Sequence, residues 1–176
     1  MDSFPKLPAD RQRIYFQEGQ QRLGLASASI EKDFWVCWTL QKLFSLPEWG
    51  EHLTFKGGTS LSKCWKLISR FSEDIDVVID RDYLGFGDET LSNNRQKKLV
   101  RRCRQRIHDG LRPLLYDYLR RALPEDHTWD LIAADEDEAP DQQTLLFRYP
   151  SVFEGTATYC ALLLRSRWGD ARKRCQ

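Results

Sequence analysis

The stretch Lys56-Gly57-Gly58-Thr59-Ser60-Leu61-Ser62-Lys63, followed after residues 64–69 by Arg70-Phe71-Ser72-Glu73-Asp74-Ile75-Asp76, decides the fold that this sequence predicts. The first segment reads as a strand that turns at two glycines into a helix, where backbone N–H groups can hold phosphate oxygens. In the second segment, two carboxylates alternate with an apolar residue at the start of a strand. Because successive side chains of a strand point to opposite faces, we expect Asp74 and Asp76 to project to the same side. The sequence therefore predicts a phosphate-binding turn beside a pair of carboxylates.

Each of these two motifs also has a purely structural explanation. An Asp-x-Asp pair at the edge of a strand is often only solvated, and any strand-to-helix turn can use glycine. Hydroxyl and ammonium groups beside the glycines favour a phosphate site, although Lys63 also fits a plain helix surface. The spacing of a Walker P-loop is absent. The combination of both motifs favours a nucleotide site in which Asp74 and Asp76 hold Mg²⁺, a cation that prefers oxygen ligands.

The composition is that of an ordinary globular protein with one domain. The chain has 176 residues, of which 41% are hydrophobic and 30% charged. No apolar run approaches a membrane span and the N-terminus lacks a signal pattern, so we expect a cytoplasmic protein without a membrane partner. Five cysteines and three histidines are scattered without metal-site spacing, which argues against zinc. We interpret Cys37 and Cys103, on predicted helix faces, as buried free thiols.

Charge is strongly segregated along the chain. Residues 91–122 carry ten basic and two acidic side chains, in a protein of net charge +1. This segment predicts an anionic partner, such as RNA or an acidic protein, although a solvated helix face is the simpler explanation for each single residue. Its first basic side chains are Arg95, Lys97, Lys98, Arg101, Arg102, Arg104 and Arg106.

Hydrophobic periodicity gives the order of the secondary-structure elements. It predicts helices at residues 9–23, from 27 or 29 to about 46, 59–68, and about 94–123, the last kinked or divided by Pro113. It predicts strands at residues 52–56, 74–80, 129–133, 144–149 and 156–164, and a loop at 81–93. The predicted fold class is therefore α/β or α+β, a small mixed sheet with packed helices.

Three motifs, in this order and spacing, resemble the AbiEii/AbiGii nucleotidyltransferase toxin family, with the resemblance extending from about residue 12 to 159. The motifs are Ile30-Glu31-Lys32-Asp33-Phe34-Trp35, Phe55–Lys63 and Arg70–Asp76. The resemblance implies a polymerase-beta-like nucleotidyltransferase fold and Mg²⁺-dependent transfer of a nucleotide from an NTP to an acceptor, which for some relatives is tRNA. It also implies a toxin of a toxin–antitoxin or phage-defence (abortive infection) system, with a cognate antitoxin as partner.

The resemblance assigns roles to particular residues. Asp74 and Asp76 become the catalytic carboxylates that hold the metal. Ser72 becomes a phosphate contact, although it is equally explained as a cap at the start of the strand. The cluster at residues 31–33 has helical spacing and is expected to be mainly structural, with Lys32 near the site. The nucleotide-binding set is Gly57, Gly58, Thr59, Ser60, Lys63 and Ser72.

The sequence departs from the family after Tyr159. The family places a third acidic residue in a later strand, within a Lys-Ile-Glu-like stretch, but residues 160–169 contain no acidic side chain. Residues 160–169 can be encoded by a set of codons that, after insertion of a single G ahead of them, is read in another frame. In that frame the codons encode Val-Arg-Pro-Ala-Val-Lys-Ile-Glu-Met-Gly, which contains the Lys-Ile-Glu stretch. We therefore interpret residues 1–159 as a nucleotidyltransferase core with N-terminal helices and residues 160–176 as an atypical, frameshifted tail. The family's C-terminal helical region is then expected to be absent.

Two other functional hypotheses remain open at this point. The missing carboxylate is compatible with a catalytically inactive remnant that acts as a nucleotide-, RNA- or antitoxin-binding module. The basic helix alone is compatible with an RNA-binding domain without chemistry. These hypotheses differ in whether the activity of the protein requires Asp74 and Asp76.

Overall fold

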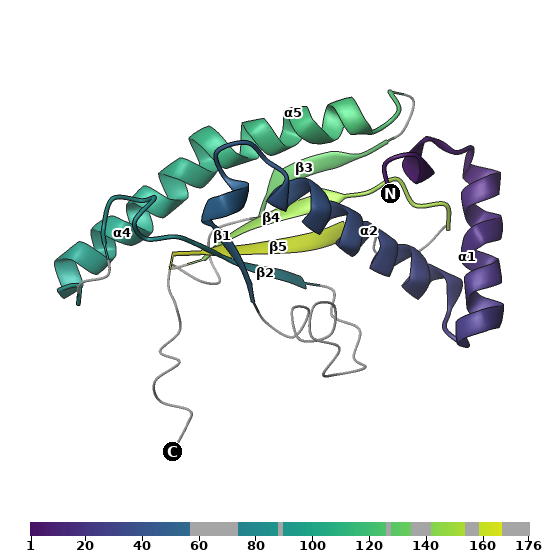
Figure 1. The fold of residues 1–176 in the computed structure, drawn as a ribbon, viewed down its shortest axis with the longest axis horizontal. Helices are drawn as coiled ribbons and strands as arrows, with labels where there is room; N and C mark the ends of the chain where they lie inside the picture. The colour runs from purple at the N-terminus through teal and green to yellow at the C-terminus, as the bar shows by residue number, and fades with distance from the viewer. Residues whose placement is uncertain (57–73, 88–89, 126–127, 135–141, 154–158, 167–176) are drawn as a thin grey trace, which may run out of the picture.

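The computed structural model of the chain describes residues 1–56, 74–87, 90–125, 128–134, 142–153 and 159–166. Within these residues a five-stranded mixed sheet is packed against helices, which confirms the predicted fold class (Figure 1). The helical elements are η1 (Phe4–Lys6), α1 (Ala9–Leu23), α2 (Ser27–Phe44), η2 (Gly50–His52), α4 (Asn93–Arg106), η3 (Ile107–Leu111) and α5 (Arg112–Ala122). The strands are β1 (Leu53–Lys56), β2 (Asp74–Ile79), β3 (Asp130–Ala133), β4 (Gln142–Arg148) and β5 (Tyr159–Arg165). The predicted helix at 59–68 lies outside the described residues.

The strands do not follow one another across the sheet in sequence order. Their order is β1-β2-β5-β4-β3, so the last strand of the chain lies between the second and the fourth. β2 runs parallel to β5, whereas β1–β2, β4–β5 and β3–β4 are antiparallel pairs. This topology places β5 directly beside the strand that carries the two aspartates.

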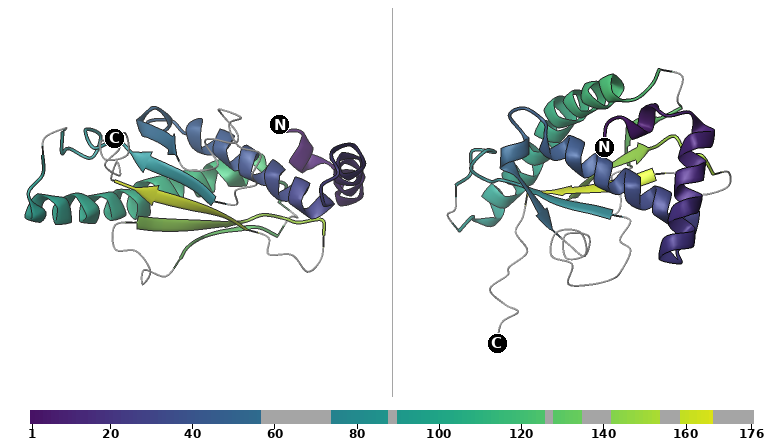
Figure 2. Two further views of the ribbon diagram at one scale, coloured as in Figure 1. Left: turned by 90° about the horizontal axis from the view of Figure 1, so that it is seen from below. Right: turned by 45° about the vertical axis from the view of Figure 1, so that its right-hand side comes forward.

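The sheet buries one of its faces against the helices. Ile75 and Val77 of β2, Leu162 of β5 and Phe147 of β4 are almost completely buried and belong to one apolar cluster. Figure 2 shows α2 and α4–α5 on the same side of the sheet. Since side chains alternate along a strand, the residues between these apolar positions project to the opposite face. Asp74 and Asp76 are among them.

Helix α2 is fixed to the sheet by aromatic side chains. Trp35 stacks on Tyr149 with ring centroids 5.5 Å apart, and Trp38 stacks on Phe147 at 6.0 Å. Both tryptophans are fully buried. Aromatic side chains bury large apolar areas in defined geometry, so these two contacts set the position of α2 over β4.

Helices α4 and α5 form one long rod along the sheet (Figure 1). The Ser92 hydroxyl accepts a hydrogen bond from the Arg95 N–H at 3.5 Å and caps the start of α4. The predicted division of this helix is confirmed: a π-helical segment, η3, separates α4 from α5 directly before Pro113. Because proline has no N–H to donate within a helix, a local change of hydrogen bonding is expected there.

Two of the predicted buried thiols have different environments. Cys103 of α4 is buried, and loss of solvation raises the pKa of its thiol to about 12. Cys37 of α2 is only half-buried, so the prediction of a buried thiol is wrong for this residue. No helix in the described ranges is both long and apolar enough to cross a bilayer.

Candidate active site on β2

The two aspartates of the Asp-x-Asp motif occupy the first and third positions of β2. Ile75, between them, is fully buried in the core, whereas Asp74 is exposed and Asp76 half-buried. This alternation places both carboxylates on the sheet face opposite the helices, as the sequence predicted. The two acidic groups therefore start the strand side by side, at the surface.

Strand β1 places a lysine beside the two aspartates of β2. In the β1–β2 register Lys56 is the Cα partner of Asp76. Burial lowers the pKa of the Lys56 ammonium. Lys56 is also the residue directly before Gly57 in the sequence. The end of β1 that leads into the glycine motif thus lies next to one of the two carboxylates.

Strand β5 flanks the aspartates on the other side but supplies no carboxylate. Ala161 is the partner of Asp74, and Leu163 is the partner of Asp76. These are the positions on the neighbouring strand nearest to the acidic pair. Neither of the two β5 positions paired with Asp74 and Asp76 carries an acidic side chain.

An arginine from β5 contacts the acidic pair. The Arg165 Nη2 atom lies 3.6 Å from Oδ1 of Asp76, and 44% of the arginine side chain is exposed. Loss of solvation raises the pKa of Asp76; the Arg165 guanidinium opposes this shift, and the Asp74 carboxylate adds to it. Sequence reasoning missed this residue because it assigned residues 160–176 to an atypical tail. The alternation of Ala161, Leu163 and Arg165 along one strand face was the signal that could have identified it.

The donor set suits a magnesium ion whose remaining ligands come from elsewhere. Two aspartate carboxylates on one strand face are hard oxygen donors, and Mg²⁺ is commonly held by one or two carboxylates together with substrate phosphates and water. Among the described residues no group of three or more His, Cys, Asp or Glu side chains could hold a metal. Asp74 and Asp76 therefore fit Mg²⁺ as a shared ligand pair rather than as part of a closed protein site.

The remaining predicted site residues cannot be placed. They all belong to residues 57–73, which lie outside the described part of the chain, so the predicted juxtaposition of the glycine turn and the carboxylates stays a prediction. These residues are Gly57, Gly58, Thr59, Ser60, Lys63 and Ser72.

Glu31 of α2 has a structural role. Its side chain is 1% exposed and accepts hydrogen bonds from the Ser151 hydroxyl at 2.7 Å and from the Val152 N–H at 2.8 Å. Burial raises the pKa of this carboxyl, while both hydrogen bonds act in the opposite direction. Glu31 thus ties the segment after β4 to α2, which agrees with the structural reading of this cluster.

Lys32 points toward the strand beside the site. Its Nζ atom lies 5.9 Å from the centroid of the Tyr159 ring, at the start of β5. Tyr159 precedes Ala161, the partner of Asp74, by two positions and so lies on the same sheet face. The contact places Lys32 beside the start of β5, and its proximity to the carboxylates stays a prediction.

The basic segment forms the outer surface of α4. Leu99 and Cys103 are buried against the core, whereas Arg106 packs on Tyr83 and Trp49, with its guanidinium carbon 4.7 Å and 5.4 Å from their ring centroids. Arg106 is thus engaged within the fold rather than available for a partner. The exposed basic residues of α4 are Arg95, Lys97, Lys98, Arg101 and Arg102.

Comparison with known proteins identifies the family. No match was found among curated proteins or among solved structures. The family model described as "Nucleotidyl transferase AbiEii toxin, Type IV TA system" matches residues 38–165, which is more than half of the chain. The match includes β1, β2 and β5 and begins after the Ile30–Trp35 motif. The chain therefore belongs to the AbiEii nucleotidyltransferase toxin family of type IV toxin–antitoxin systems.

Proposed function

We propose that this protein transfers a nucleoside monophosphate from an NTP to an acceptor, with Mg²⁺ as cofactor and an RNA such as tRNA as the acceptor. It acts as a cytoplasmic toxin, in abortive infection or another type of defence, and is controlled by a cognate antitoxin. The observation that supports this proposal is the location of Asp74 and Asp76 on one face of β2, beside Lys56.

The roles of the residues follow from their positions. Asp74 and Asp76 would hold Mg²⁺, which supplies charge neutralisation at the phosphates and orients the attacking hydroxyl when bound. Lys56 adds a positive charge at the same strand end and is suited to a phosphate oxygen. The glycine-motif residues, lying outside the described part of the chain, are proposed to hold the triphosphate. This nucleotide-binding set is Gly57, Gly58, Thr59, Ser60, Lys63 and Ser72.

A second candidate function is supported by β5. Ala161 and Leu163 flank the aspartates and Arg165 contacts Asp76, so among the described residues β5 brings a cation and no third carboxylate to the site. These features favour a catalytically inactive remnant that still binds nucleotide, RNA or antitoxin. A frameshift after Tyr159 would explain why this strand has no carboxylate. The nucleotide sequence downstream of the Tyr159 codon tests the frameshift, because codons incompatible with the alternative frame would exclude it.

Transfer and binding assays together separate the two candidates. The purified chain is incubated with labelled NTPs, Mg²⁺ and total tRNA, and compared with the Asp74→Ala/Asp76→Ala variant. The matched control is Asp10→Ala/Glu18→Ala, which removes two exposed carboxylates from α1. Loss of transfer only in the first variant supports the enzyme, and transfer that survives it shows that the carboxylates are not the site. NTP binding without any transfer by the wild type supports the remnant.

A further inference from the structure

A cleft of about 820 Å³ lies between the end of α5, the η1 segment and the residue that precedes β3. In the sheet order, β5 and β4 separate β3 from β2, which carries the two aspartates. The cleft is therefore not part of the candidate active site. We call it the Tyr116–Trp129 cleft; the lining side chains that matter here are Lys6, Tyr116, Arg120, Arg121, Glu125 and Trp129.

The apolar part of this cleft includes two aromatic rings beside Leu123 and Pro124. Tyr116 is 41% exposed, and its ring centroid lies 5.0 Å from that of Trp129. Trp129 in turn contacts the buried ring of Phe147 at 6.3 Å. The tryptophan is thus anchored in the core and supports Tyr116 from one side. Tyr116 itself is exposed and lines the cleft, so part of its ring surface faces solvent.

The charged part of the cleft is basic. Lys6, Arg120 and Arg121 contribute three positive charges against the single carboxylate of Glu125. In the part of the chain that the structure describes, no ion pair engages either of these arginines. The lining of the cleft therefore carries an excess of positive charge, which favours an anionic ligand.

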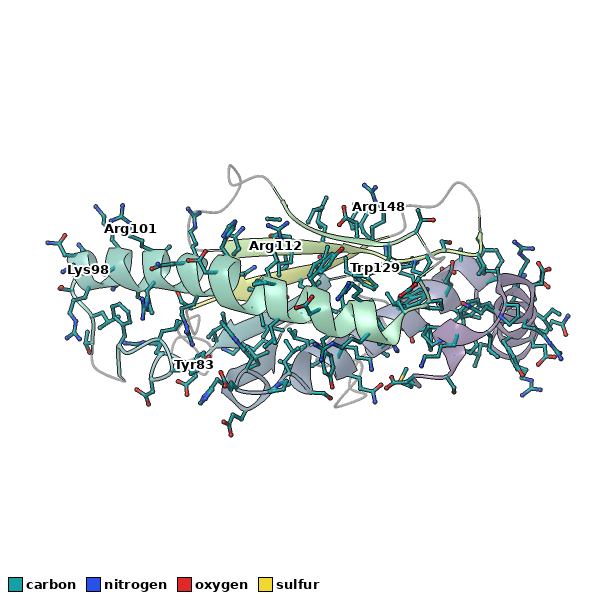
Figure 3. The ribbon with its side chains drawn as sticks, turned by 90° about the horizontal axis from the view of Figure 1, so that it is seen from above. Tyr83, Lys98, Arg101, Arg112, Trp129 and Arg148 are labelled. Carbon is teal, nitrogen blue, oxygen red and sulfur yellow. The ribbon has the colours of Figure 1, made fainter. Side chains whose placement is uncertain are left out.

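The basic surface continues from the cleft along the helical rod. Arg112 and Arg120 are four residues before and after Tyr116, and side chains at this spacing are neighbours on a helix surface. Figure 3 shows Lys98, Arg101 and Arg112 following one another along α4–η3–α5 toward Trp129. An exposed aromatic ring thus lies within a row of cations that extends over several helical turns.

From this arrangement we infer that the Tyr116–Trp129 cleft binds a single-stranded nucleic acid. A base stacks on the ring of Tyr116, while Arg120, Arg121 and the arginines along the rod contact phosphates. Stacking platforms combined with a basic track are the usual recognition mode for single strands, whose bases are free to stack. An acidic protein could use the charges but has no need of the exposed ring. This inference goes beyond the proposed nucleotide transfer and does not depend on it.

The test measures binding of a short fluorescein-labelled oligonucleotide to the full chain by fluorescence anisotropy over a series of salt concentrations. Single-stranded RNA, single-stranded DNA and a blunt RNA duplex are compared. Tyr116→Leu is matched by Tyr15→Leu, an exposed tyrosine of α1. Arg120→Gln/Arg121→Gln is matched by Arg11→Gln/Arg22→Gln, which removes two exposed arginines from α1.

The two cleft variants are expected to differ in how their affinity for nucleic acid depends on salt. Tyr116→Leu weakens single-strand binding about fivefold or more without changing its salt dependence, since only stacking is lost. Arg120→Gln/Arg121→Gln weakens binding and reduces the slope of log affinity against log salt by about 1.4, at about 0.7 per lost phosphate contact. The α1 controls bind like the wild type, and the duplex binds more weakly than either single strand.

Several results would overturn the inference. If Tyr116→Leu binds single strands as tightly as the wild type does, or if duplex and single strand bind with equal affinity, the cleft is only a non-specific basic surface. Stronger binding of an acidic polypeptide such as polyglutamate, sensitive to the same variants, would assign the cleft to a protein partner. Binding by the Asp74→Ala/Asp76→Ala variant should equal that of the wild type. Failure of the transfer proposal therefore leaves this result unaffected.

Discussion

Arg165 Nη2 lies 3.6 Å from Oδ1 of Asp76, so a guanidinium from β5 contacts one of the two carboxylates of the candidate active site. Asp76 is half-buried, and the partner positions on β5 beside the acidic pair are Ala161 and Leu163. The positive charge of Arg165 thus lies beside the acidic pair, on a strand that has no carboxylate of its own. We therefore expect Arg165 to compete with a divalent cation for Asp76.

Removal of this arginine is expected to strengthen metal binding. Arg165→Gln should bind Mn²⁺, used as a probe for Mg²⁺, about two- to fivefold more tightly, because a partly exposed ion pair contributes up to about 1 kcal/mol. Arg165→Glu, which adds a carboxylate, should bind more tightly still. The measurement is the free Mn²⁺ signal in electron paramagnetic resonance during titration of the full chain.

Arg148→Gln is the control for this prediction. Arg148 is exposed at the end of β4, on the same sheet face, but it is paired with Tyr159 rather than placed beside the aspartates. An equal gain in both variants would indicate a general charge effect. Unchanged or weaker Mn²⁺ binding by Arg165→Gln would show that the guanidinium does not compete with the metal.

Loss of the Glu31 carboxylate is expected to destabilise the fold. Glu31→Ala leaves the buried Val152 N–H without its acceptor, whereas the Ser151 hydroxyl keeps the Phe153 carbonyl at 3.0 Å as a second acceptor. The free energy of unfolding should fall by about 1–3 kcal/mol, the cost of one buried unsatisfied donor. Urea unfolding followed by circular dichroism measures the change, and Glu31→Gln, which keeps one carbonyl acceptor, should lose less. If Glu18→Ala, at an exposed position, lowers the free energy of unfolding by the same amount, the buried hydrogen bonds of Glu31 are not the cause of the destabilisation.

The Asp2–Lys42 ion pair gives stability that depends on pH. Lys42 is buried and lies 2.8 Å from the Asp2 carboxylate, and this hydrogen bond is the main reason that the pKa of Asp2 is below its ordinary value of 3.8. An acid whose pKa is lowered by folding stabilises the native state above its unfolded pKa, and this contribution disappears as pH falls through the folded value.

Asp2→Asn should therefore be less stable than the wild type at pH 7 by less than about 1 kcal/mol, because the Asp2 side chain is 56% exposed. The difference should shrink as the pH falls below about 4, since only the wild type loses the charge. Thermal unfolding across this range measures it. Asp10→Asn, whose pair with Arg13 is more exposed, should change less. A deficit that persists in acid would exclude the ion pair as its origin.

The Cys103 thiol should resist alkylation in the folded protein. Burial raises its pKa to about 12, so almost none of it is the reactive thiolate at neutral pH. Iodoacetamide labelling followed by peptide mass spectrometry should leave Cys103 unmodified until urea unfolds the chain. The half-buried Cys37 should react earlier. Early labelling of Cys103 would show that α4 opens locally.

Much of the secondary structure could be predicted because its signals are local. The apolar alternation around Ile75 predicted a strand from residue 74, and β2 begins at Asp74. Pro113 predicted the division of the long helix, although η3 lies just before the proline rather than at it. The order of the strands could not be predicted, because pairing depends on which surfaces are buried together and not on spacing along the chain.

The sequence alone determined that Asp74 and Asp76 share a side, because the two-residue period of a strand fixes this without reference to any neighbour. Only the tertiary structure decided that β5 lies beside β2 and brings Arg165 to Asp76. In the same way it placed Tyr116 and Trp129, from different elements, around one cleft. The physical reason is that such contacts arise from burial of one sheet face under the helices, a property of the whole chain rather than of any single segment.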